Sequence, residues 1–97
     1  MAAGGQVAQS ALEVSVGLAA CRQEWALAAE LFGAAEALTL RTGLRRDAAD
    51  EAFLRPLMER TRVALGSEPY LNLEDGGRRL PLPDALSRAR AWLETWS

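Results

Sequence analysis

Histidine and lysine are both absent from this chain of 97 residues, so all eleven basic residues are arginine. These absences remove the commonest general base, the amine that forms Schiff bases, and the Ser-His and Cys-His nucleophile pairs. A single cysteine, Cys21, cannot assemble a zinc site without histidine, and the sequence has no GxxxxGK[ST] or GxGxxG phosphate loop. We therefore expect a protein that is not an enzyme and has no catalytic residues, no cofactor and no metal.

Long apolar runs and an excess of basic charge are also missing. The net charge is −2 and no long expected helix has a basic face, so we expect no direct nucleic-acid binding. No segment reaches the length of a membrane span, and the opening MAAGGQVAQS lacks the basic region of a secretory signal. Because a lone cysteine forms no intramolecular disulfide, the chain suits a reducing compartment, and we expect a cytoplasmic protein without membrane contact.

What the sequence does contain is helical periodicity. An apolar fraction of 49% predicts one folded, helical-repeat-like domain over residues 1–97, with residues 1–5 expected to be disordered. Apolar residues recur at three- and four-residue spacings and no segment alternates with a period of two, which predicts an all-α fold. The expected helices cover residues 6–22, 24–42, 47–65, 68–75 and 82–97.

Glycine, proline and capping residues set these boundaries. Gly43 is expected to end the second helix, Gly66 the third, and Ser67 to cap a short fourth helix. The DGG sequence is expected to stop that helix, and RRLPLP to be extended because residues before proline avoid helical angles. Pro56 predicts either a kink in the third helix or a later start of that helix.

Apolar stripes are expected on the third and last helices. The stripe of the third helix comprises Phe53, Leu54, Leu57, Met58, Thr61 and Leu65. The stripe of the last helix comprises Leu82, Ala85, Leu86, Ala89, Trp92, Leu93 and Trp96. Arg88 and Arg90 are expected to lie mostly away from that stripe. Trp92 is interpreted as a core residue, whereas Trp96 suits the core or an interface.

The stretch WALAAELFGAAEAL, residues 25–38, combines many small residues with one tryptophan and one phenylalanine. Alanine favours a helix but buries little area, so such a pattern indicates that another helix lies very close. Ala28, Phe32 and Ala35 share one helical face, and Trp25 opens the helix. This spacing resembles a tetratricopeptide repeat, a hairpin of two helices, although Gln23 stands where the turn glycine is usual.

Further matches follow in the same order along the chain, at Leu31, Gly33, Ala34, Ala35, Glu36, Leu38, Leu65, Gly66, Gly77, Arg78, Leu80, Leu82, Asp84 and Ala85. Together they resemble the C-terminal tetratricopeptide-like segment of bacterial LuxR-type and MalT-like transcriptional regulators and related signal-transduction ATPases. Pro81 departs from the serine or threonine that commonly caps the last helix there. The matching residues include neither the nucleotide-binding nor the DNA-binding domain of such regulators, so the resemblance implies neither activity for this chain.

The resemblance implies a non-catalytic protein-interaction or scaffold module, with a small-molecule (inducer) sensing module as the alternative. The helix-packing signature is Trp25, Ala28, Phe32 and Ala35. Because the first helix is apolar on two faces, Val7, Val14 and Leu18 are expected to form an uncovered strip that favours a homodimer, with Trp96 next in line.

Two further groups of charges have competing interpretations. The pairs Arg45–Arg46 and Arg78–Arg79 suit contacts with an anion or an acidic partner, but solvated loop charge is the more ordinary explanation. The acidic cluster of Asp47, Asp50 and Glu51 lies at a helix start, where carboxylates cap the helix; catalysis or metal binding is the lesser interpretation.

Overall fold

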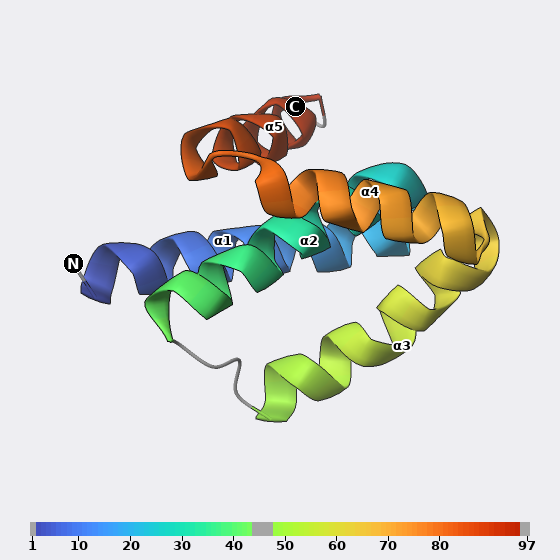
Figure 1. Ribbon diagram of the computed structural model, residues 1–97, viewed down its shortest axis with the longest axis horizontal. Helices are drawn as coiled ribbons and strands as arrows, with labels where there is room; N and C mark the ends of the chain where they lie inside the picture. Colours follow the sequence, from blue (N-terminus) through green and yellow to red (C-terminus); the bar gives the residue numbers. More distant parts are fainter. Residues whose placement is uncertain (1, 44–47, 96–97) are drawn as a thin grey trace.

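The computed structural model describes residues 2–43 and 48–95, with side chains described from residue 8 onward. Five helices account for almost all of this part of the chain, which contains no strand, so the all-α prediction is confirmed (Figure 1). The helices are α1 (Ala2–Cys21), α2 (Trp25–Thr42), α3 (Ala48–Leu65), α4 (Ser67–Arg79) and α5 (Leu82–Glu94). The first helix therefore begins four residues before the expected start at Gln6.

Helix α2 lies at the centre of the molecule and packs against each of the other four helices (Figure 1). Its small residues Ala28, Ala29 and Ala35 are fully buried, as is Leu31. On α1, the face that carries Leu12 and Val16 is also fully buried in the core. The expected pairing of the first two helices is therefore present, although the finer tetratricopeptide-like geometry is not established by it.

The turn between α1 and α2 requires an unusual backbone conformation. Gln23 has a φ of 63°, in the left-handed region that favours glycine. This is the position where a repeat hairpin usually carries glycine. At the other end of α2, Gly43 has a φ of 73° and its N–H donates to the carbonyl of Thr39 at 2.9 Å, which confirms the expected C-cap.

The backbones of α2 and α4 lie very close together at two glycines. A Cβ atom added at Gly33 would overlap the carbonyl oxygen of Glu74, and one added at Gly77 would overlap the carbonyl oxygen of Glu30. The two glycines therefore allow the two backbones to touch reciprocally. The sequence correctly indicated a close neighbour for the small-residue helix, but the nearest contact of Gly33 is α4 rather than α1.

Several expectations for α4 are wrong. The helix continues through Gly76 and Gly77 and ends at Arg79, so DGG does not stop it and Arg78 and Arg79 are not extended. Burial of Gly77 against α2 explains the difference, because the same missing side chain that weakens a helix makes the close packing possible. Gly66, with a φ of 90°, occupies the N-cap position expected for Ser67.

Helix α3 continues from Ala48 through Pro56 to Leu65, whereas Asp47, where the helix was expected to start, lies outside the described residues. Pro56 and Ala52, whose carbonyl loses its helical partner, are both exposed, so water can solvate that carbonyl. Leu54, Leu57, Met58 and Thr61 are buried as expected. Phe53 is not part of the inner stripe, because 55% of it is exposed and its ring lies across Gly17 of α1.

A buried polar network runs along α4. The Tyr70 hydroxyl donates to Oε2 of Glu74 at 3.1 Å, and Arg78 pairs with Oε1 of the same carboxylate at 3.1 Å. Burial, and then the negative charge and hydrogen bond of Glu74, raise the pKa of Tyr70 well above its usual value. The phenol therefore stays protonated and keeps donating to Glu74.

The glycine contact between α2 and α4 can be tested by adding one methyl group. Gly77→Ala is expected to lower the free energy of unfolding by about 1–3 kcal/mol, because the backbones must separate. Gly76→Ala is the matched control: its Cβ meets nothing within 4 Å, so better helix propensity should raise stability by about 0.5–1 kcal/mol. Urea unfolding followed by circular dichroism measures both. Equal stability of the two variants would contradict the close contact.

The Tyr70 network predicts a loss of stability at alkaline pH. Because the folded-state pKa is raised, the contribution is fully present below the unfolded-state pKa of about 10 and is lost as pH rises above it. Tyr70 is the sole tyrosine, so tyrosinate absorbance reports this group directly. The chain has no lysine, so no side-chain amine titrates in the same pH range. The native protein should titrate above pH ~10, and Tyr70→Phe should flatten the fall in melting temperature there. Native titration at the unfolded-state value would refute the network.

Candidate binding surface

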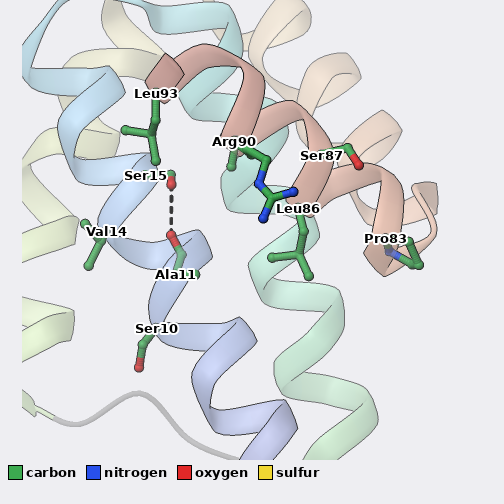
Figure 2. A pocket seen from close by; sticks show the side chains of 10 residues that line it. Ser10, Ala11, Val14, Ser15, Pro83, Leu86, Ser87, Arg90 and Leu93 are labelled. Atoms are coloured by element: carbon green, nitrogen blue, oxygen red, sulfur yellow. Dashed lines mark hydrogen bonds between the residues drawn. The ribbon is translucent and has the colours of Figure 1, made fainter. Parts of the chain in front are cut away.

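A cavity of about 750 Å³ lies between α1 and α5. Figure 2 shows side chains of α1 on one side of it and side chains of α5 on the other. The α1 side carries Ser10, Ala11, Val14 and Ser15, and the α5 side carries Pro83, Leu86, Ser87, Ala89, Arg90 and Leu93. Most of these residues are apolar or small, and the hydroxyl of Ser15 already donates to the carbonyl of Ala11 at 2.9 Å. The cavity therefore offers mainly apolar contact with few free polar groups.

A smaller hollow of about 210 Å³ lies on the other side of Val14, between α1 and α3. It shares Ser10 and Val14 with the larger cavity, and Phe53 forms part of its wall. Gly17 allows this arrangement, because a Cβ atom there would come within 2.6 Å of the Phe53 ring. Val14 thus forms the boundary between two hollows, one flanked by α5 and the other by α3.

We call the surface formed by Ser10, Val14, Phe53, Leu86, Arg90 and Leu93 the Val14 surface. Val14 is 58% exposed, and Phe53 and Leu93 are 55% and 37% exposed. Three large apolar side chains therefore face solvent on neighbouring parts of one surface. Such a patch is typical of a site that contacts a partner or a ligand.

The one charged side chain of this surface, Arg90, is exposed at the edge of the apolar stripe of α5. Leu86, Arg90 and Leu93 are four and three residues apart, so they share one face of α5 (Figure 2). Arg90 is exposed, as expected of a residue that lies mostly away from the stripe, and it lines the cavity beside these two leucines. Within the described part of the chain, Arg90 forms no salt bridge. Arg88, by contrast, pairs with Glu30 of α2 at 2.7 Å.

The helix-packing signature lies in the interior of the molecule. Ala28 and Ala35 are fully buried, and Trp25 and Phe32 are half-buried against the core. Trp92, expected in the core, is half-buried and packs against the small cluster that contains Ala28. These residues hold the helices together and do not line the Val14 surface.

The residues expected to favour self-association differ in how exposed they are. Val14 is well exposed, whereas Leu18 is half-buried. Val7 belongs to α1 but its side chain lies outside the described residues, as does the whole of Trp96. The structure therefore places one member of the expected strip, Val14, at the centre of an exposed apolar surface.

Of the two arginine pairs, only one lies among the described residues. Arg78 and Arg79 form salt bridges with Glu74 and Asp75, one helical turn earlier on α4. Since both guanidinium groups already have carboxylate partners, they are weak candidates for an anion site. Arg45 and Arg46 lie outside the described residues, as does Asp47 of the expected capping cluster.

A third hollow, of about 460 Å³, lies between the turn after α1 and the outer face of α3. Cys21, Trp25 and Arg60 contribute to its walls, and Cys21 is exposed. Across the described residues, no group of three histidine, cysteine or acidic side chains could hold a metal ion. None of the described helices is long and apolar enough to cross a membrane.

Apart from Val14, the five residues of the Val14 surface were not identified as site residues from the sequence. Phe53, Leu86 and Leu93 each fit an inward-facing stripe, so their periodicity gave no sign of exposure. Arg90 did carry a signal, since it falls between two leucines of one helical face.

Comparisons with protein-family models, curated proteins and solved structures give no match for this chain.

Proposed function

We propose that this chain is a non-catalytic protein-interaction module whose contact surface is the Val14 surface, and that its simplest partner is a second copy of itself. The observation that carries the proposal is the 58% exposure of Val14 between two hollows. Exposed valine and leucine side chains each forgo about 1.5–3 kcal/mol of burial, so covering several of them favours association. A two-fold dimer is the simplest closed arrangement that buries one such surface on both copies.

The absence of a catalytic role is part of the same proposal. The chain has no histidine or lysine, and the hydroxyl of Ser15 in the cavity is bonded to a backbone carbonyl. Ser10 and Ser87 also line the cavity, but its lining residues include no carboxylate that could act as their base. The further proposal of a role in transcription regulation, in a bacterial cytoplasm, is supported by the sequence resemblance to LuxR-type and MalT-like regulators.

Small-molecule sensing is a second candidate function, and the cavity between α1 and α5 favours it. Ligand pockets commonly have volumes of about 300–1,000 Å³ and are mostly apolar with a few polar groups. A cavity of about 750 Å³ with apolar walls and one arginine meets that description. Both functions use Val14, because it lines the cavity and forms the centre of the proposed interface.

Self-association through the Val14 surface predicts a dimer that one charge can separate. The wild-type chain should be dimeric at tens of micromolar by light scattering after size exclusion. Val14→Arg should be monomeric, because it would bury an unpaired charge at the interface. Since Val14 is exposed, circular dichroism should show that this variant stays folded.

Leu40→Arg is the matched control, since Leu40 is 81% exposed on α2 and lines none of the three hollows described above. It should remain dimeric. A wild-type monomer would contradict self-association, and a dimer that Val14→Arg leaves intact would place the interface elsewhere.

A further inference from the structure

The cavity between α1 and α5 has walls of known chemistry, from which the class of its ligand follows. We infer that this cavity binds a small molecule with an apolar body and one carboxylate, and that Arg90 holds the carboxylate. The inference deepens the ligand-sensing candidate above and depends on it. Its evidence is the position of one arginine in an apolar wall and the size of the space in front of it.

The charge of the ligand follows from the surroundings of Arg90. The guanidinium lies on the same face of α5 as Leu86 and Leu93 and forms no salt bridge with any described residue (Figure 2). Covering it with a neutral apolar body would remove water from an unpaired charge, which is costly. A carboxylate removes that cost, because it can accept two parallel hydrogen bonds from one guanidinium.

The residues that line the cavity also limit how many negative charges its ligand can carry. Arg90 is the one cationic residue among those that line the cavity, so a dianion would leave a negative charge without a partner there. Ser10 and Ser87, both exposed, offer neutral hydroxyl groups at the edges. The remaining wall, including Ala11, Val14 and Leu93, suits an alkyl chain or an aryl group.

The size of the cavity favours a small molecule over an inserted helix. The α5 wall runs from Pro83 to Leu93, which is about 15 Å at the helical rise per residue. A helix of that length and about 10 Å across has a volume of roughly 1,200 Å³, so only one side of it could enter a cavity of about 750 Å³. A chain or ring system of medium size fits the available 750 Å³.

Decanoate is a suitable probe, with decanol as the neutral molecule of the same chain length. Isothermal titration calorimetry of the full chain, below the concentrations at which the probes aggregate, should show saturable binding of decanoate. Arg90→Gln should weaken decanoate binding by about tenfold or more and leave decanol binding unchanged. Arg60→Gln is the matched control, because Arg60 also lacks a salt bridge among the described residues but lines the third hollow. It should bind decanoate like the wild type.

A second variant tests whether the probes bind in this cavity while Arg90 is left in place. Ala11 is exposed and lines the cavity, so Ala11→Phe should fill the space and block both probes while the protein stays folded. If Arg90→Gln binds decanoate with the same affinity as the wild type, the assignment of Arg90 as the partner of the carboxylate is overturned. If decanol binds equally well and Ala11→Phe blocks it, the cavity still binds ligands but not by their charge.

Because the proposed dimer would cover the cavity, the titration is carried out at a protein concentration at which light scattering shows a monomer. Absence of saturable binding of either probe there would overturn both the inference and the ligand-sensing candidate. Arg90-dependent binding of an acidic amphipathic peptide in place of decanoate would overturn the inference as well, because the occupant would then be a protein segment. Neither result affects the proposal of self-association, which light scattering tests separately.

Discussion

The contact between Gly33 and Gly77 is the constraint on which the rest of the arrangement depends. Each glycine faces a backbone carbonyl of the other helix, that of Glu74 or Glu30, so neither position has room for a side chain. This contact fixes the C-terminal half of α4 against the middle of α2. Glycine normally weakens a helix, by about 0.5–1 kcal/mol relative to alanine, and here that cost is offset by packing that alanine would prevent.

The position of α5 follows from this contact. Leu80 and Pro81 are extended, so the chain turns directly after α4 and α5 returns towards α1 and α2. Two small residues of α5, Ala85 and Ala89, enter the core, and Arg88 reaches Glu30 of α2. The larger residues of the neighbouring face remain between α5 and α1, where the space is not filled. The cavity is therefore a consequence of small residues on one face of α5 and long residues on the next.

Periodicity and capping rules predicted most of the helices from the sequence. The places where packing between helices overrides those rules could not be predicted from it. Helical periodicity identified the five helices, and Gly43 and Gly66 gave correct ends because glycine tolerates the positive φ that both positions adopt. The same rule failed at Gly77, where glycine serves close packing within a helix and not termination. Periodicity placed Phe53 inward because it cannot reveal that α1 covers this side of α3 only in part. Of the candidate site, the sequence identified Val14, but not the neighbours that make it part of a surface.

The two proposals meet at Val14, which lines the cavity and lies at the centre of the proposed interface. A ligand that occupies the cavity and a second copy that covers the surface would therefore compete for the same apolar atoms. By linkage, each would lower the affinity of the other by the same factor. A ligand that binds the monomer more tightly than the dimer would shift the population towards the monomer by that difference in affinity. An exposed apolar surface that serves both as a ligand cavity and as an interface is thus sufficient to convert ligand binding into a change of assembly.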